Sequence, residues 1–235
     1  MYMSTTYGIH QPRTKLKDRV LPDYTKGEEI FNMVSHIIGG ALGIAALVLC
    51  VVKSAMKGDP WGVVSSSIYG SSLIILYTMS SVYHGLHKNM GKKVMQVIDH
   101  CTIYYLIGGT YTVIVLAGIR RIHPGWAWTI FGLVWGLSIT AAVFTAIDHN
   151  KYHKMSMILY LAIGWCIVIA AKPTIEAVGW PAILWILGGG VAYSIGAALY
   201  SFGKKSGKRY MHSVFHLFVL AGSILQFFGI YFCVL

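Results

Sequence analysis

Residues 211–233 read MHSVFHLFVLAGSILQFFGIYFC, a run of 23 residues without Asp, Glu, Lys or Arg. About 20 apolar residues in a helix are enough to cross the hydrocarbon core of a bilayer. His212 and His216 stand at the start of this run, directly after the basic loop KKSGKR at 204–209. Ionisable groups inside a membrane are costly and usually have a function, so this pair is the first indication of a site.

The composition of the whole chain agrees with a membrane protein. Of its 235 residues, 56% are hydrophobic and only 11% are charged, and the mean hydropathy is +0.62. A soluble domain averages about 25% charged residues. The net charge of +11 could suggest a nucleic-acid partner. However, the basic residues flank the apolar runs instead of forming one patch, so we expect no nucleic-acid binding.

Apolar runs predict seven membrane spans, at about 30–52, 60–84, 95–118, 125–147, 155–171, 181–202 and 211–233. The fifth is short, and we expect Lys172-Pro173 to stop it. Small residues such as IGGALG at 38–43 favour close contact between helices. The sequence therefore predicts an all-α membrane protein, with a polar tail over residues 1–29 and a seven-transmembrane-helix bundle over residues 30–235.

The distribution of basic residues predicts the orientation of this bundle. Fourteen of the 19 Lys and Arg residues fall in the tail or after spans 2, 4 and 6, and five fall on the other side. The positive-inside rule then places the N-terminus in the cytoplasm and the C-terminus outside. We expect a multi-pass protein of the cell membrane.

This orientation brings polar residues from several spans to the inner leaflet. Span 2 ends with Ser80 and His84 on one helix face, and Asp99 lies about one turn inside span 3. Span 7 begins with His212 and His216. Two histidines at i and i+4 present their nitrogens to one point, and His84 on a facing helix would supply a third.

Three histidines predict a zinc site with an open position. Three protein ligands leave the fourth position for water, as in catalytic zinc centres, and zinc lowers the pKa of that water to about 7. We therefore predict that His84, His212 and His216 bind Zn²⁺. Asp99 would accept or orient the water's proton, and Ser80 would hydrogen-bond a ligand, the water or the substrate.

Other polar residues have simpler explanations. Glu29, Asn32 and His36 follow one face of span 1, and they would cap a helix or join helices by hydrogen bonds as readily as support the site. His149 and His153 are also four residues apart, but neighbouring lysines should disfavour a cation there. We expect this pair to lie at the membrane interface, and we expect the same of the remaining histidines. These remaining residues are His10, His87, His100 and His123.

These residues form three signatures that resemble a known family. The signatures are E-x-x-N-x-x-x-H at Glu29, Asn32 and His36, S-x-x-x-H with a later Asp at Ser80, His84 and Asp99, and H-x-x-x-H at His212 and His216. From about residue 28 onward, the chain resembles the hemolysin III branch of the progestin and adipoQ receptor family. The wider group includes the adiponectin receptors and the alkaline ceramidases.

The resemblance implies a seven-helix bundle with a cytoplasmic N-terminus, and a zinc ion held by three histidines with the Asp near the metal-bound water. It also implies hydrolysis of lipid amides, as in the ceramidase relatives. The extended tail of the adiponectin receptors is absent, and the chain stops at Leu235, so we do not expect receptor function. The name hemolysin implies membrane lysis, yet no feature of the sequence explains a pore.

Three classes of function remain open at this point. The first is a zinc-dependent hydrolase of a lipid amide or ester bond, linked to membrane lipid homeostasis, with a membrane lipid as its substrate or ligand. The second is a non-enzymatic homeostasis factor or sensor, or a hemolysin-like protein, with a structural zinc. The third is a proton or ion relay, which we rank last because spans 5 and 6 are nearly free of ionisable groups. The sequence leaves the oligomeric state open.

Overall fold

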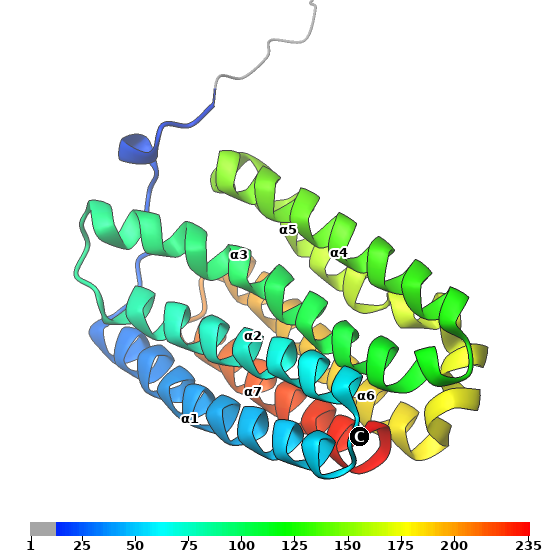
Figure 1. Cartoon of the computed structure of the whole chain (residues 1–235). Helices are drawn as coiled ribbons and strands as arrows, with labels where there is room; N and C mark the ends of the chain where they lie inside the picture. Colours follow the sequence, from blue (N-terminus) through cyan, green and yellow to red (C-terminus); the bar gives the residue numbers. More distant parts are fainter. Residues whose placement is uncertain (1–12) are drawn as a thin grey trace, which may run out of the picture.

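The structure is a computed structural model that describes residues 13–235, and these residues form helices and no strand. The all-helical prediction is confirmed. Its α-helices are α1 (Lys26–Met56), α2 (Pro60–Gly85), α3 (Met90–Val113), α4 (Pro124–Ile147), α5 (His149–Gly164), α6 (Ala171–Ser206) and α7 (Met211–Gly229). Shorter helical segments are η1 (Leu16–Asp18), η2 (Ile114–Gly118), η3 (Ile119–Arg121), η4 (Cys166–Ala170) and η5 (Ile230–Val234). Figure 1 shows the long helices packed side by side in a bundle.

Six helical runs in the described part of the chain are long and apolar enough to cross a membrane. They are Lys26–Met56, Pro60–Gly85, Met90–Arg121, Pro124–Ile147, His149–Ser206 and Met211–Val234. The fifth run contains 58 residues and would be about 87 Å long as one straight helix. In Figure 1 it turns back in the yellow segment, so that α5 and α6 run in opposite directions.

Two breaks interrupt this run. The first is η4, between the end of α5 at Gly164 and the start of α6 at Ala171, and the second lies inside α6. Gly179 has a positive φ of 76°, which interrupts the helical geometry of α6, and Pro181 follows two residues later with no backbone N–H to donate. The predicted stop at Lys172-Pro173 is wrong. Pro173 lies in the first turn of α6, where backbone N–H groups have no helical partner in any case, so it does not break the helix.

Helix starts follow local capping. Thr25 and Glu28 form a reciprocal capping box at α1, and the Asn89 side chain accepts the Lys92 N–H at α3.

Helices pack closely where small residues face a neighbouring helix. The Tyr77 ring of α2 occupies the space beside Gly39 of α1, where a Cβ would clash with it. The expectation that the glycines of IGGALG permit close helix contact is confirmed at this position.

The basic residues separate to the two ends of the bundle. At one end, Arg13 Nε donates to the Ile147 carbonyl at 2.7 Å, and Arg209 Nη1 donates to the Asp23 carbonyl at 2.5 Å. The N-terminal segment therefore lies against the α4–α5 and α6–α7 connections. At the other end, Arg121 pairs with Asp59 at 2.8 Å, and Lys53 Nζ donates to the Tyr231 carbonyl. We call the end with Arg13 and Arg209 the histidine end, after the site described below. We call the end with Arg121 and Lys53 the far end.

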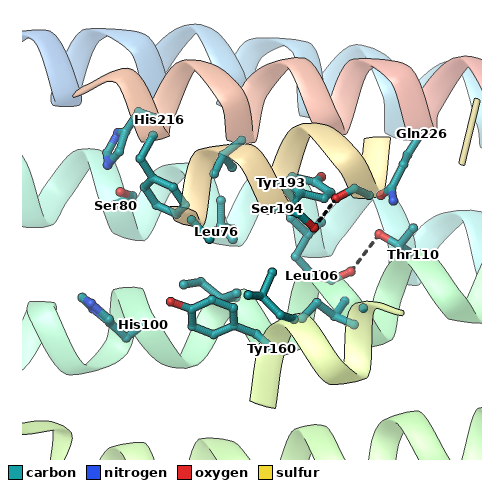
Figure 2. A pocket seen from close by; sticks show the side chains of 18 of the residues that line it. Leu76, Ser80, His100, Leu106, Thr110, Tyr160, Tyr193, Ser194, His216 and Gln226 are labelled. Carbon is teal, nitrogen blue, oxygen red and sulfur yellow. Dashed lines mark hydrogen bonds between the residues drawn. The ribbon is translucent and has the colours of Figure 1, made fainter. Parts of the chain in front are cut away.

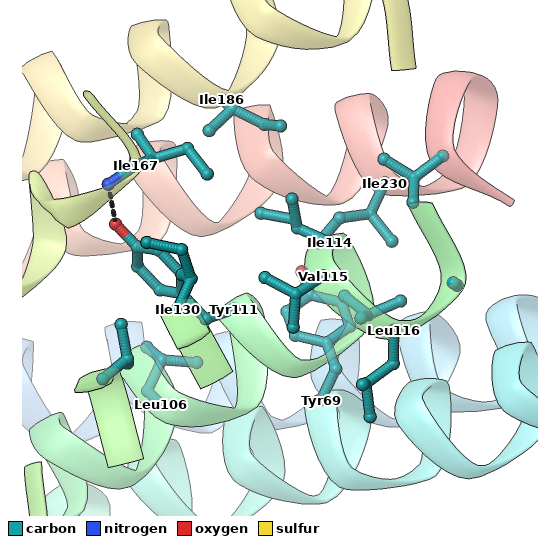
Figure 3. Packing of buried hydrophobic residues seen from close by; sticks show 14 of the residues in the cluster. Tyr69, Leu106, Tyr111, Ile114, Val115, Leu116, Ile130, Ile167, Ile186 and Ile230 are labelled. Carbon is teal, nitrogen blue, oxygen red and sulfur yellow. Dashed lines mark hydrogen bonds between the residues drawn. The ribbon is translucent and has the colours of Figure 1, made fainter. Parts of the chain in front are cut away.

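The far end of the bundle is filled with apolar side chains (Figure 3). Val113, Val115 and Ile119 are fully buried there. The Tyr111 hydroxyl donates to the Gly164 carbonyl at 2.8 Å and accepts the Ile167 N–H at 2.7 Å, which satisfies the backbone at the end of α5. Since lipid tails are as apolar as leucine, close packing and such hydrogen bonds hold membrane helices together. The unsatisfied polar groups lie mainly at the opposite end.

Candidate metal centre

Three histidines from two helices converge at the histidine end. His84 is in the last turn of α2, and His212 and His216 are in the first turns of α7. Their candidate ligand atoms all lie within 4.8 Å of one another, and the Nε2 atoms of His212 and His216 are 3.1 Å apart. Two nitrogens bound to one tetrahedral zinc ion would lie about 3.3 Å apart, given Zn–N bonds of 2.0–2.1 Å. The spacing fits a shared ion.

A carboxylate orients one of the three rings. Glu29 Oε2 lies 2.6 Å from Nδ1 of His84. The carboxylate accepts the Nδ1 proton, so Nε2 is left as the free acceptor of the neutral ring. That Nε2 is buried and has no hydrogen-bond partner among the described residues. Carboxylate–histidine pairs of this kind accompany most metal-binding histidines, because they fix the tautomer and make the ligand more basic.

A buried lysine holds this carboxylate in turn. Lys92 is 2% exposed, and its Nζ lies 2.6 Å from Glu29 Oε1 and 2.9 Å from the Leu86 carbonyl. This role was not predicted, because Lys92 is one of the basic residues after span 2 and indicated only the orientation of the bundle. The sequence carries no signal for the pairing, which depends on how α1 and α3 face each other.

Aromatic contacts fix the other two rings. His36 of α1 stacks on His216, with ring centroids 3.8 Å apart and planes at 18°. Tyr24, just before α1, stacks on His212 at 5.0 Å and 10°. Burial raises the pKa of the Tyr24 phenol well above its ordinary value, so this ring stays neutral. Tyr24 is a second contact that sequence reasoning missed, since a residue in the predicted tail gave no sign of lying on α7.

The donor set limits the metals that fit. Three neutral imidazoles suit zinc, copper, iron or nickel better than magnesium or calcium, which prefer oxygen ligands. The orphaned Nε2 of His84, facing a pair of close Nε2 atoms, is the feature of this site that a metal ion would satisfy. The residues therefore fit a transition metal bound by three histidines.

Asp99 and Ser80 lie beside this group but outside it. Both line a cavity that also reaches His36, His212 and His216. Ser80 is 1% exposed, and the Asp99 side chain is 14% exposed. Asp99 is not among the atoms that converge within 4.8 Å. The structure thus brings the five residues of the second and third signatures to one place, with the carboxylate of α3 next to the metal group.

The cavity beside the metal group is mainly apolar. Its volume is about 130 Å³ and it extends between α2, α3, α5, α6 and α7. Figure 2 shows His216 and Ser80 near one end, and Thr110 and Gln226 near the other. Leu76 and Leu106 line the space between them. The cavity therefore joins the metal group to an apolar interior.

Asn32 differs from the other signature residues in its side chain. It is fully buried, and neither atom of its side-chain amide has a hydrogen-bond partner within residues 13–235. Of the two roles left open for Asn32, hydrogen bonding of its side chain between helices is not found in that part of the chain. Glu29 and His36 contact the rings of His84 and His216 respectively, so these two support the metal group.

The remaining histidines divide into two sets. His87 is exposed, and His123 pairs with Glu176 at 2.7 Å near the surface, which is consistent with interface residues. His149 is only 5% exposed, and its ring lies 4.1 Å from that of His100. The interface prediction is therefore wrong for His149, because the chain folds back over it. His10 lies outside the described residues.

Comparison with known proteins places the chain in a family. The profile described as "Haemolysin-III related" matches residues 24–227. Hemolysin-3 of Bacillus cereus is 35% identical over 208 residues, covering 88% of this chain and 92% of the relative. A hemolysin-3 homolog of Bacillus subtilis (strain 168) is 34% identical over 212 residues, covering 90% and 97%.

A more distant match is the monocyte to macrophage differentiation factor of Homo sapiens, which is 22% identical over 212 residues and covers 87% of this chain and 83% of the relative. The matched region includes α1 through most of α7, and with them every residue of the metal group. Together with the six apolar helical runs, these matches indicate a multi-pass protein of the cell membrane. The chain belongs to the haemolysin-III-related family.

Proposed function

We propose that this protein is a zinc-dependent hydrolase that cleaves an amide or ester bond of a membrane lipid at the inner leaflet, and so serves membrane lipid homeostasis. The observation that carries the proposal is the buried Nε2 of His84, which is free of hydrogen bonds and lies beside the Nε2 atoms of His212 and His216. Glu29 behind His84 is a partner of the kind that orients many metal-binding histidines.

Zinc is the metal we propose for this group. His84, His212 and His216 would hold it, and three protein ligands would leave one position open. When bound, zinc would supply a Lewis acid that polarises a carbonyl group and makes water acidic near neutral pH. The chain's own residues supply the remaining functions.

Asp99 and Ser80 are the groups we propose for proton transfer and oxygen stabilisation. Asp99 lines the cavity beside the metal group without belonging to it, so its carboxylate is free to take the proton of the attacking water and return it to the leaving group. Ser80 is a hydroxyl donor on the same wall, suited to the oxygen that becomes negative as the carbonyl is attacked.

The apolar cavity would hold the lipid chain. Leu76, Leu106 and Phe215 line it within reach of the histidines, so a chain lying there would carry its polar bond to the metal group. Apolar walls also exclude bulk water, which strengthens the electrostatic contacts of Asp99 and Ser80 with the reacting atoms.

We further propose that α1 to α7 make seven membrane crossings, with the histidine end in the cytoplasm and residues 30–235 as the membrane domain. Fourteen of the 19 Lys and Arg residues lie in segments of the histidine end, which supports this orientation. A reporter fused at the N-terminus should then be cytoplasmic, and one fused after Leu235 should be outside. Two cytoplasmic reporters would contradict it.

The test of the proposed activity combines metal analysis with a hydrolysis assay. Purified protein should contain about one zinc per chain and cleave a lipid amide or a lipid ester. A chelator should remove both the metal and the activity, and added zinc should restore both. Zinc retained without cleavage of any amide or ester lipid would instead favour a structural zinc in a non-enzymatic homeostasis protein.

A further inference from the structure

A second cavity, which we call the polar cavity, lies at the histidine end. Its volume is about 230 Å³, and its walls come from the segment before α1 and from α2, α3, α5, α6 and α7. Hydrogen-bond donors dominate these walls. They include Lys204, His100, His149, His153, Tyr24 and Tyr200. No Asp or Glu of residues 13–235 lines it.

The polar cavity meets the apolar cavity at the metal group. His100 and His212 line both spaces, so the two cavities adjoin on either side of these rings. A lipid with its chain in the apolar cavity and its scissile bond at His212 would place its polar headgroup in the polar cavity. The apolar cavity therefore suits the hydrocarbon chain of a lipid, and the polar cavity suits its headgroup.

In the described part of the chain, one buried histidine of this region lacks a hydrogen-bond partner for its Nδ1, and one exposed lysine, Lys204, is not paired with a carboxylate. His149 is 5% exposed, yet its Nδ1 has no hydrogen-bond partner among the described residues. Lys204 Nζ makes no ion pair with a carboxylate in that part of the chain. The neighbouring Asp148 is occupied, because its carboxylate accepts the N–H groups of Thr14 at 2.7 Å and Lys151 at 3.1 Å.

We propose that the polar cavity binds the phosphate group of a lipid headgroup, so that the substrates are phosphate-bearing lipids instead of neutral ones. This rests on the proposed function, which it narrows to a class of lipid. A phosphate has oxygens in several directions, and donors here come from α3, α5 and α6 as well as from the segment before α1. Lys204 supplies the positive charge, and a charged hydrogen bond is about twice as strong as a neutral one.

The test measures binding to full-length protein in nanodiscs. The probes are radiolabelled dodecyl phosphate, dodecanol as the neutral match, and inorganic phosphate as the match without a chain. Dodecyl phosphate should bind at least about tenfold more tightly than either, the effect expected of a hydrogen bond to a charged group. Lys204→Gln should weaken it by about tenfold, and His153→Gln should weaken it less.

Lys205→Gln is the matched control, because Lys205 is the neighbouring exposed lysine and does not line the cavity. It should leave binding unchanged. Equal affinity for dodecyl phosphate and dodecanol, or equal losses in Lys204→Gln and Lys205→Gln, would overturn the proposal. Inorganic phosphate binding as tightly as dodecyl phosphate would assign the cavity to the free ion and overturn the headgroup assignment.

Two further measurements separate this proposal from the proposed function. Binding is repeated after chelator treatment, because a phosphate could also ligate a metal at the three histidines. A preference that survives chelation supports the polar cavity, and one that disappears overturns it. Zinc content and hydrolysis of a neutral lipid amide are measured on the same samples. Hydrolysis without phosphate preference refutes only the headgroup site, and phosphate preference without any hydrolysis refutes only the hydrolase.

Discussion

Two pairs of histidines at the same end of the bundle have the same spacing and different surroundings. His212 and His216 begin α7, and their ring centroids lie 4.5 Å apart. His149 and His153 begin α5, and their ring centroids lie 5.6 Å apart. The first pair joins His84 in a group whose ligand atoms converge within 4.8 Å, and the second belongs to no such group in residues 13–235. Spacing along one helix is therefore not enough to make a metal site.

The nearby carboxylates account for the difference. Glu29 lies on a facing helix, α1, and accepts from Nδ1 of His84, which leaves the other nitrogen of His84 for a metal. Asp148 directly precedes His149, but it caps α5 by accepting the Lys151 N–H. The ring of His149 has no carboxylate partner among residues 13–235. The first pair has a third candidate ligand, His84, and a carboxylate that orients that ligand, and both come from other helices.

The largest effect should come from removing a ligand of the first pair's group. His84→Ala, His212→Ala and His216→Ala should each reduce zinc from about one per chain to nearly none, because two imidazoles hold zinc far more weakly than three. His149→Ala and His153→Ala are the matched controls and should keep full zinc. Metal analysis of the purified variants checks this. Equal losses from both pairs would remove the distinction between them.

The next effect concerns the reaction and not the metal. Asp99→Asn should retain zinc and lower lipid hydrolysis by about 100-fold or more, the usual contribution of a general acid–base group. The reason is that Asp99 lines the cavity at the metal group without joining its ligands. Zinc content and the hydrolysis rate are measured together. Loss of zinc in Asp99→Asn would make the carboxylate a fourth ligand, as in a structural site.

Much of this arrangement could be predicted from the sequence, because it depends on helix periodicity and on which end of a span a residue occupies. His84, His212 and His216 were predicted to meet for those reasons, and the structure brings them together. The burial of Lys92 against Glu29 could not be predicted, because it depends on the rotation of α3 relative to α1. The break in α6 coincides with the predicted start of span 6 at residue 181, where Gly179 and Pro181 stand two residues apart.

The contact of Tyr24 with His212 shows a second limit of the sequence. The polar composition of residues 1–29 predicted a polar tail, and polarity does not report where a short segment lies. The segment is held by contacts far apart in the chain, such as Arg19 Nη2 with the Ile147 carbonyl at 3.1 Å. Such contacts depend on where α4 and α7 lie in the bundle, and no local pattern encodes them.

A smaller effect should follow from changing the orienting carboxylate. Glu29→Gln should weaken zinc binding by about 10- to 100-fold, the usual cost of losing the carboxylate behind a histidine ligand. Asp148→Asn is the matched change beside the second pair and should leave zinc affinity unchanged. Titration with a competing chelator gives both affinities. If Glu29→Gln bound zinc as tightly as the unaltered protein, Glu29 would serve to join α1 to α3 through Lys92 and not to orient His84.

The smallest effect should separate the structural role of Asp148 from any role in binding a metal. Asp148→Ala removes the side-chain cap of α5 and should lower stability by about 1 kcal/mol, without loss of zinc. Asp148→Asn should keep most of that stability, because Asn caps a helix nearly as well. Thermal unfolding of the two variants in one detergent measures the difference. A drop in zinc content with Asp148→Ala would mean that the second pair contributes to the metal after all.

The pH dependence of the stability difference between the unaltered protein and Asp148→Asn tests the charge of Asp148. Burial alone would raise the pKa of Asp148, but hydrogen bonds from the Thr14 and Lys151 backbone and the nearby Arg19 charge outweigh it and lower the pKa below 3.8. A lowered pKa means that the carboxylate stabilises the fold fully above about pH 4 and loses this contribution as the pH falls through the folded-state pKa. The stability gap between the unaltered protein and Asp148→Asn should therefore be constant from pH 7 to 5 and shrink below pH 4. A gap that instead shrinks between pH 7 and 5 would point to a histidine, and so to His149 as the group that Asp148 stabilises.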